Sequence, residues 1–534
     1  MEAVQNELDR HTAFPARLTA IMRSFANLRL PFAAQDLSNS KRAPKLAKTI
    51  GSCRWRRHGR EEASGWKIKL VVFLLSTLLP IPDLTADWPQ FRGPGGLGIA
   101  AEADPPVHFG PSTNVLFSIE LPAGNSSPII SGNRILLTGR EGGNLLTMAF
   151  DKRTGKNLWT QEFSPGRLEP FHASLGSPSS STPVTDGTNV YVYFGSFGLM
   201  AYSLEGAELW RKPLVEPILE FGASTSPILA GGKLILQSDQ DMNSALLGID
   251  PRTGKTLWKT DRSEFPRAFG SPFLWQNELG EELVVPGTLY LTSYDPASGQ
   301  ELWRARAQSR VVCTSPVAGE GLLFAASWTT GGDSLNKMTL PPFQETDLDK
   351  DGVIRKEEIP AGPIRDRFAQ IDFDKDKRIT PAEWAKMTDI FARVENSVVA
   401  IRPGGRGDIT DTHLLWKRNR GTPYVPSPLY YKGRLYTVKN GGLFSCFDAK
   451  TGQPYYEEER LGAIGDYYSS PIVANGRIYV ISQTGTVVVV AAGDTLSVLA
   501  RNPLGEQTLA TPAAQGKVLY VRTARHLHAF SERP

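Results

Sequence analysis

In two stretches of the sequence, carboxylates stand at the spacing needed to coordinate a cation through oxygen atoms. In DLDKDGVIRKEE, residues 347–358, acidic side chains stand at positions 1, 3, 5 and 12, and Gly352 stands at position 6. Ca²⁺ takes roughly six to eight hard oxygen ligands, which this spacing can supply from one loop. A solvated acidic turn is the alternative, but such a turn rarely meets all these positions. The predicted ligands are Asp347, Asp349, Asp351, the carbonyl of Val353 and Glu358.

The stretch DFDKDKRITPAE, residues 372–383, repeats this pattern, and the two loops together have the sequence of an EF-hand pair. Lys377 occupies position 6, where the turn needs a positive φ that costs a residue other than Gly roughly 1 kcal/mol. We therefore expect the second loop to bind calcium more weakly, and we expect Ile354 and Ile379 to pair between the loops. The predicted ligands of the second loop are Asp372, Asp374, Asp376, the carbonyl of Arg378 and Glu383.

The elements that must position these loops belong to a repeat. A turn of the type DPRTGKTLW, residues 250–258, recurs along the chain, and a Ser-Pro or Thr-Pro pair opens an apolar strand about every 44 residues. A repeat of this length with four short strands has the size of one propeller blade. One interval of 112 residues carries an insertion of about 65 residues, which contains both acidic loops. The strand-opening residues are Ser127, Thr182, Ser226, Ser271, Ser315, Ser427, Ser470 and Thr511.

These repeats predict an all-β fold, an eight-bladed β-propeller of four-stranded antiparallel blades with a small inserted α-helical EF-hand pair. The propeller covers residues 114–531, the EF-hand pair interrupts it at 335–395, and residues 87–113 are assigned as a linker. The insertion falls between the second and third strands of its blade, which places it on the face that carries the connections between blades. Residues 114–121 would complete the last blade and remove both open sheet edges.

Each residue type in the repeated turn has a structural role. Asp accepts hydrogen bonds from turn amides, Gly takes the positive φ, and Trp packs between neighbouring sheets. Where a blade lacks the Trp, we expect Phe117, Tyr456 and Leu499 to take its position.

One copy of the turn, AFDKRTGKNLW at residues 149–159, resembles the tryptophan-docking motif of pyrrolo-quinoline quinone (PQQ)-like propellers, and the resemblance covers about residues 114–531. That family includes calcium-dependent quinoprotein alcohol dehydrogenases and non-catalytic members such as the propeller component of the outer-membrane β-barrel assembly machinery. The dehydrogenases stack their quinone on a disulfide of adjacent cysteines, and this sequence has no Cys-Cys pair. The resemblance therefore implies the fold more strongly than the function.

We expect a calcium-binding scaffold that holds a protein, peptide or glycan ligand on one propeller face. The alternative is a PQQ-dependent quinoprotein dehydrogenase that oxidises alcohols or sugars. No motif assigns catalytic or quinone-binding residues, so the sequence leaves the question of enzymatic activity open and favours a binding role.

The N-terminal region has the features of an export signal. Residues 1–86 form an extension followed by a signal peptide, with an apolar run at 70–82 and expected cleavage after Ala86. We therefore expect an exported protein, periplasmic or extracellular, without a stable membrane span.

Residues 1–69 carry 14 Lys and Arg against 6 Asp and Glu, so the remainder carries 45 against 49, a net charge of −4. This slightly acidic body argues against a nucleic-acid partner.

Overall fold

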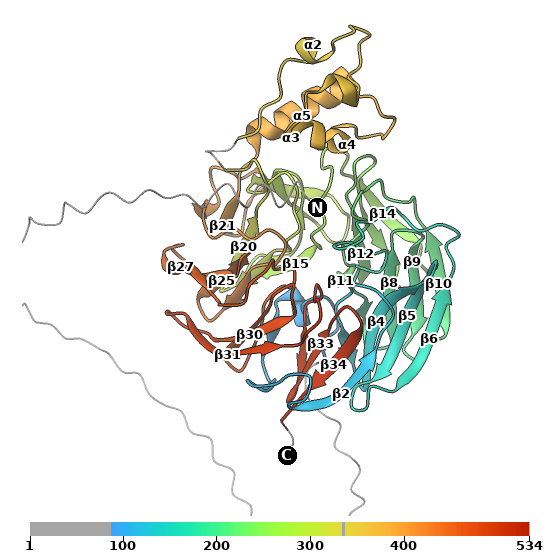
Figure 1. Cartoon of the computed structure of the whole chain (residues 1–534), viewed down its shortest axis with the longest axis vertical. Coiled ribbons are helices and arrows are strands. Elements are labelled where there is room, and N and C mark those ends of the chain that lie inside the picture. The colour runs from blue at the N-terminus through green and yellow to red at the C-terminus, as the bar shows by residue number, and fades with distance from the viewer. Residues whose placement is uncertain (1–86, 334–336, 533–534) are drawn as a thin grey trace, which may run out of the picture. The chain divides into compact units, whose positions relative to one another are not determined.

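The computed structural model describes residues 87–333 and 337–532, and all statements below concern these residues. The predicted signal peptide and its N-terminal extension lie outside them. Eight separate sheets make up the propeller seen in Figure 1, which confirms the predicted fold class. Six sheets have four strands, and the sheets of the fourth and seventh blades each gain a fifth, parallel strand.

The strands of the first four blades follow one another along the chain, each blade running from its inner to its outer strand. Blades 1 and 2 consist of β3 (Ile129–Ser131), β4 (Arg134–Glu141), β5 (Asn144–Asp151), β6 (Asn157–Phe163), β7 (Val184–Thr185), β8 (Asn189–Phe194), β9 (Gly198–Ser203) and β10 (Glu208–Pro213). Blades 3 and 4 consist of β11 (Ile228–Ala230), β12 (Lys233–Ser238), β13 (Ala245–Ile249), β14 (Thr256–Asp261), β15 (Phe273–Asn277), β16 (Gly280–Pro286), β17 (Tyr290–Tyr294) and β18 (Glu301–Arg306).

The other four blades continue the ring. Blades 5 and 6 consist of β19 (Val317–Gly319), β20 (Leu322–Ser327), β21 (Ser397–Ile401), β23 (Leu414–Arg418), β24 (Leu429–Tyr431), β25 (Arg434–Lys439), β26 (Leu443–Asp448) and β27 (Pro454–Arg460). Blades 7 and 8 consist of β28 (Ile472–Ala474), β29 (Arg477–Ile481), β30 (Thr486–Ala491), β31 (Ser497–Pro503), β32 (Ala513–Gln515), β33 (Val518–Arg522), β34 (His526–Phe530) and β2 (Val115–Glu120). The two added strands are β1 (Ile99–Ala100) and β22 (Gly407–Asp408).

The last blade is closed by a strand from the beginning of the propeller. β2 pairs antiparallel with β34, with Phe117 opposite Ala529 and Ser118 opposite His528. This pairing confirms the predicted closure. It gives blade 8 an outer strand that its own C-terminal segment does not supply.

Alternation along each strand joins neighbouring blades. In β8, Val190 and Val192 lie in one apolar cluster with blade 1, whereas Tyr191 and Tyr193 lie in another with blade 3. Successive side chains of a strand point to opposite faces, so one strand packs against both neighbours. Comparable clusters join the remaining pairs of blades, and the core is therefore a ring of sheet-to-sheet contacts.

The eight strand-opening hydroxyls form a closed circle of hydrogen bonds around the centre of the propeller. In each blade the backbone N–H of the Ser or Thr donates to the hydroxyl oxygen of the Ser or Thr in the next blade. The donor–acceptor distances are 2.9–3.0 Å. The bond from Thr511 to Ser127 joins blade 8 to blade 1 and completes the circle. We call this set of eight residues the hydroxyl ring.

The repeated turns dock the Trp side chains as the sequence predicts. The Nε1 of Trp210 donates to the carbonyl oxygen of Pro251 at 2.8 Å, in the turn of the next blade. A Cβ added to Gly254 would lie 2.8 Å from the Trp210 ring, so only glycine allows this approach, and its φ is +70°. The same bond runs from Trp159 to Leu204 at 2.9 Å.

The prediction that Leu499 replaces the docking Trp in blade 7 is wrong. The side chain of Leu499 is 40% exposed, whereas Ala500 is buried in the apolar cluster shared by blades 7, 8 and 1. Ala500 lies opposite Val489, directly before the register shift of the pair β30 and β31. Trp258 lies directly before the corresponding shift in blade 3, so Ala500 has the docking position. The predictions for Phe117 and Tyr456 hold, because both side chains are buried at the docking position.

The helices lie in the interval between β20 and β21, apart from the short η2 (Pro94–Gly96). They are α2 (Phe343–Thr346), η4 (Lys356–Glu358), α3 (Pro363–Asp366), α4 (Phe368–Ile371) and α5 (Pro381–Arg393). Figure 1 shows α2 to α5 gathered on one side of the propeller. Among the described residues no helix is long and apolar enough to span a membrane.

Residues 88–110 run along several blades before the propeller begins. Trp88 bridges to Ile130 in blade 1, β1 pairs with β28 in blade 7, and Asp104 donates its backbone N–H to Gly516 in blade 8. Arg92 is fully buried and donates to the carbonyl oxygen of Pro428 at 2.6 Å. This segment, whose residues the sequence marks only as a linker, contacts blades that lie far apart in the chain.

Candidate metal centre and its docking on the propeller

Each acidic loop brings three carboxylates together. One oxygen from each of Asp347, Asp349 and Asp351 lies within 4.8 Å of the others, and the same holds for Asp372, Asp374 and Asp376. These are the residues predicted at positions 1, 3 and 5 of the loops. Clustered carboxylate oxygens repel one another and attract a hard cation, so each group has the donor chemistry that Ca²⁺ prefers.

The first carboxylate of each loop has an oxygen without a hydrogen-bond partner. Asp347 is 7% exposed and Asp372 is 3% exposed. The Oδ2 of Asp347 accepts from the backbone N–H of Gly352 at 3.1 Å, and the Oδ2 of Asp372 accepts from Lys377 at the same distance. The Oδ1 atom of each is buried and has no partner among the described residues. Because a buried carboxylate oxygen without a partner is costly, both atoms could serve as ligands of a bound cation.

The carboxylates at position 12 bind the backbone of their own loops. Glu358 accepts from the N–H groups of Leu348 and Arg355 at 2.8 and 2.6 Å. Glu383 accepts from Phe373 and Thr380, both at 2.8 Å. These bonds, first among them the one from Arg355, lower the pKa of Glu358. Glu358 and Glu383 are not part of the three-carboxylate groups, so their role as ligands, like that of the Val353 and Arg378 carbonyls, stays a prediction.

The backbone of the loops has the conformation that the pattern requires. Gly352 has φ +88° and Lys377 has φ +70°, which confirms the expected strain at position 6 of the second loop. Ile354 and Ile379 form the predicted bridge, with N–H to carbonyl distances of 2.9 and 2.8 Å in the two directions. This bridge ties the two loops into one unit, residues 337–394, which we call the calcium unit after the ion that the loops are predicted to bind.

The calcium unit has its own apolar core, and this core includes a residue of the propeller. Ile371, Trp384 and Phe391 are buried in a cluster with Leu289, which lies in the hairpin between β16 and β17. Tyr290 packs against the same cluster, and its hydroxyl accepts from Arg393 at 3.1 Å. The unit therefore packs on blade 4 as well as being inserted in blade 5.

A buried ion network fixes the second loop to the propeller. Asp241, in the hairpin between β12 and β13, is fully buried and accepts from Arg267 Nε at 2.5 Å and from Lys375 Nζ at 2.5 Å. Arg267 also donates to the carbonyl oxygen of Ala369 at 3.2 Å and pairs with Glu220 at 3.2 Å. Lys375 is position 4 of the second loop, so this loop is held by residues of blade 3 and of the connections that flank it.

Two further groups on this face have strongly shifted pKa values. Burial lowers the pKa of Arg310 to about 10, while one of its Nη atoms donates to Gln370 of the calcium unit at 2.9 Å. Burial raises the pKa of Glu169 to about 8, and one of its carboxylate oxygens has no partner among the described residues. Glu169 lies in the connection from blade 1 to blade 2.

Apart from Tyr290, the first residue of β17, the propeller residues named above as contacts of the calcium unit come from the connections between blades or from hairpins between second and third strands. The predicted location on this face, which we call the connecting face, is therefore confirmed. The six Asp residues predicted from the sequence do come together in two groups, and their role as ligands stays a prediction; Asp241 and Arg267 were not predicted, because neither belongs to a local motif.

A protein-family model described as "Outer membrane protein assembly factor BamB" matches residues 142–331 and 408–533. The chain belongs to this family. The calcium unit lies in the interval between the two matched regions. A search of curated proteins finds no match.

Solved structures agree with the BamB family in fold. BamB from Moraxella catarrhalis has a TM-score of 0.50 at 12% identity, covering 79% of this chain and 98% of its own. The computationally designed Ika8 protein has a TM-score of 0.50 at 11% identity, covering 78% and 99%. Quinohemoprotein alcohol dehydrogenase from Comamonas testosteroni has a TM-score of 0.48 at 11% identity, covering 84% and 81%. At these identities the likeness to the first two structures concerns the fold alone.

Proposed function

We propose that this BamB-family protein is an exported calcium-binding scaffold that holds a protein partner on its connecting face. The observation that carries the proposal is the pair of three-carboxylate groups, each with a buried unpartnered oxygen, on a unit docked to that face. Membership in a family described as an assembly factor supports a role in binding proteins. Arg355 pairs with Asp349 and Asp351 in the first group, and calcium would neutralise the remaining negative charge of both groups and fix the loops in place.

Calcium binding is tested by isothermal titration of the full chain with CaCl₂ in excess MgCl₂. We expect two calcium ions per chain, with one lost in Asp347→Asn and the other lost in Asp372→Asn. The first loop should bind about five-fold more tightly, since the positive φ of Lys377 costs roughly 1 kcal/mol. The control is Asp250→Asn, which removes an Asp of similar turn chemistry outside the unit. Absence of binding at millimolar calcium, or equal loss in the control, would refute this part of the proposal.

The binding role is tested by site-specific photo-crosslinking in cells that produce the full chain. Ile464 is 87% exposed in the connection between blades 6 and 7, on the connecting face. Leu279 is 66% exposed in the turn between β15 and β16, at the opposite ends of the strands, and provides a matched control. We expect crosslinks to protein from position 464 and not from position 279. Equal labelling from both positions would contradict a binding role for this face.

The quinoprotein alternative is distinguished by adding PQQ and Ca²⁺ to the purified protein. We expect no stoichiometric quinone complex and no oxidation of alcohols or sugars with an artificial electron acceptor. A stable complex with PQQ that oxidises an alcohol or a sugar would show that the protein is an oxidoreductase and would overturn the scaffold proposal. Export is tested by fractionating cells that produce the full chain into cytoplasm and cell envelope, and recovery in the cytoplasm alone would overturn the proposed export.

A further inference from the structure

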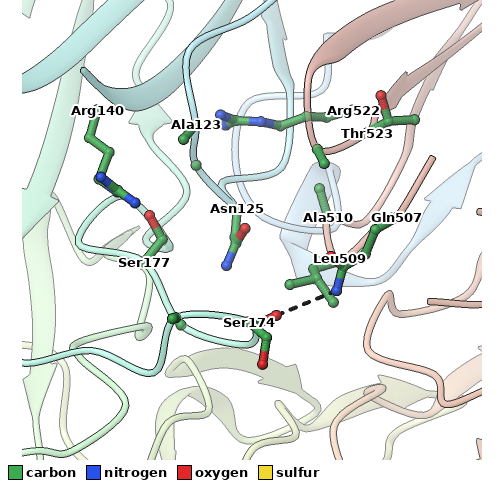
Figure 2. Close-up of a pocket in the computed structure, with 14 residues that line it drawn as sticks. Ala123, Asn125, Arg140, Ser174, Ser177, Gln507, Leu509, Ala510, Arg522 and Thr523 are labelled. Atoms are coloured by element: carbon green, nitrogen blue, oxygen red, sulfur yellow. Dashed lines mark hydrogen bonds between the residues drawn. The ribbon is translucent and has the colours of Figure 1, made fainter. Parts of the chain in front are cut away.

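A polar cavity lies on the connecting face at the seam where the ring closes. Its volume is about 150 Å³, and its walls come from blade 1, from the connection between blades 1 and 2, and from the residues that join blades 7 and 8. Figure 2 shows Arg140 and Ser177 along one wall and Gln507 and Leu509 along the opposite wall, with Asn125 between them. This cavity is separate from the acidic loops of the calcium unit.

Both charged side chains of the cavity are arginines. Arg140 and Arg522 line it, and its other lining residues are Ala, Gly, Leu, Ser, Thr, Asn and Gln. In the described part of the chain no carboxylate forms an ion pair with either guanidinium. Glu506 lies next to the lining residue Gln507, but its oxygens accept from Thr523 at 2.7 Å and lie 2.7 Å from a nitrogen of His526. The cavity thus has a positive charge that no acidic side chain balances.

Arg140 supplies the more accessible of the two charges. Its guanidinium carbon lies 5.0 Å from the centre of the Phe171 ring, which holds the side chain by a cation–π contact. The Nε atom of Arg140 is buried and has no hydrogen-bond partner among the described residues. Among the described residues the guanidinium thus contacts an aromatic ring and no hydrogen-bond acceptor, so its N–H groups are available to donate to a bound molecule.

Arg522 lies deeper, behind the loop that carries Ala123. It is 1% exposed and donates to neutral oxygens only, at Ser126, Thr138 and Pro122, over 2.7–3.2 Å. Its Nε is buried without a partner, and burial lowers its pKa to about 9. A buried cation without a counter-charge is costly, and a nearby anion would offset part of that cost.

Amide donors complete the cavity. Gln507 Nε2 donates to the carbonyl oxygen of Ser174 at 3.4 Å, across the mouth, and Asn125 Nδ2 donates to that of Leu175 at 3.4 Å. Both distances lie at the long end for a hydrogen bond, so either amide can turn to a better acceptor at little cost. The dashed line in Figure 2 marks the bond from Gln507.

We propose that this cavity binds a small oxyanion, with Arg140 as the principal contact and Asn125 and Gln507 as neutral donors. A guanidinium matches the geometry of carboxylate and phosphate oxygens, and both classes share this chemistry. The cavity is about five times the roughly 30 Å³ that one water occupies in the liquid, which suits an ion of phosphate or acetate size. It is smaller than the roughly 300 Å³ at which pockets for drug-sized ligands begin.

The test is direct titration of the full chain with sodium phosphate and, in separate arms, with sodium acetate and sodium succinate. Sodium chloride at matched ionic strength serves as the reference. We expect saturable heat for at least one oxyanion, weakened about ten-fold or more in Arg140→Met, because a charge-assisted contact is lost. Phosphate alone would identify a phosphate site, and the carboxylates alone would identify a carboxylate site. The absence of saturable binding in every arm would overturn the proposal.

The matched control is Arg211→Met. Arg211 lies 5.2 Å from the centre of the Phe163 ring, a cation–π contact like that of Arg140, and it also pairs with Glu208 outside the cavity. Its substitution should leave oxyanion binding unchanged, and equal weakening in both variants would overturn the assignment to this cavity. Protection of Arg140, but not Arg211, from phenylglyoxal by the bound oxyanion is the second readout. Unchanged modification of Arg140 at saturating oxyanion would contradict the site even if binding is detected.

Discussion

The docking of the calcium unit on the propeller depends on one buried carboxylate. Asp241 lies between Arg267 and Lys375, at 2.5 Å from a nitrogen of each, and its side chain is fully buried. The substitution Asp241→Asn keeps the size of the side chain but leaves two cations close together without the negative charge between them. We predict that the second acidic loop then separates more often from the propeller.

The magnitude follows from burial. Removing one partner of a buried ion pair costs about 3–5 kcal/mol, because the remaining charge is left without compensation. Arg267 keeps its contacts to Glu220 and to the carbonyl oxygen of Ala369, so we expect the lower end, about 3 kcal/mol. This corresponds to a rise of about 100-fold in the population of the separated state, since each 1.4 kcal/mol is about ten-fold.

Hydrogen exchange followed by mass spectrometry measures this opening locally. Peptides covering residues 363–383 should exchange about 100-fold faster in Asp241→Asn, in buffer that contains calcium. The control is Asp494→Asn, in which the lost contact is Asp494 Oδ1 to Arg434 Nε at 2.6 Å, but Asp494 is 51% exposed. Solvent and salt screen such a pair, so its own peptides should be unchanged. The reasoning is refuted if exchange in residues 363–383 stays within about two-fold of wild type, or if both variants lose protection equally.

Three further predictions concern the propeller. In the hydroxyl ring, Ser271→Ala leaves the buried N–H of Ser226 unpaired and should lower the free energy of unfolding by about 1–3 kcal/mol. Ser271→Thr keeps a hydroxyl acceptor and should retain this stability. Urea denaturation of both variants measures the difference. Burial raises the pKa of Glu169 to about 8 from 4.5, so the stability it contributes is present below about pH 4.5 and lost as pH rises through about 8. Unfolding curves across this range should show a flatter profile for Glu169→Gln, and an unchanged profile would contradict the assignment. Deleting residues 87–121 removes β2 and exposes the edge of β34, so light scattering should detect aggregation of the truncated protein. A truncated protein that stays unaggregated and unfolds cooperatively would contradict this prediction.

The fold could be predicted because each blade solves the same packing problem with the same residues. The turn, the docking aromatic and the strand-opening Ser or Thr are local patterns, and their repetition reveals the architecture. Leu499 shows where the sequence pattern misleads: Ala500 lies opposite Val489, 11 positions earlier, whereas Trp258 lies opposite Gly248, 10 positions earlier, so the turn of blade 7 is one residue longer and moves the docking position by one residue. A shift of one residue turns every side chain to the other face of the sheet, and the sequence alone does not place it.

The acidic loops could be predicted for the same reason, since the carboxylates of each loop lie within twelve residues of one another. The residues that hold the unit against the propeller could not. Asp241 and Lys375 are 134 positions apart, and Arg140 and Arg522 meet around one cavity only because the ring closes. Contacts of this kind depend on which blades become neighbours, and no short-range pattern encodes them.

The hydroxyl ring has a consequence for how the chain can be cut. Each blade gives one N–H to the next and takes one from the blade before, so the circle has the same direction everywhere and no first member. Its bond across the seam, at 3.0 Å, lies within the 2.9–3.0 Å range of the other seven. A circular permutant whose new chain ends lie in any of the connections between blades keeps all eight bonds, provided that a short linker joins β34 to β2. The position of the chain ends is therefore a property of the covalent chain that the folded ring does not require.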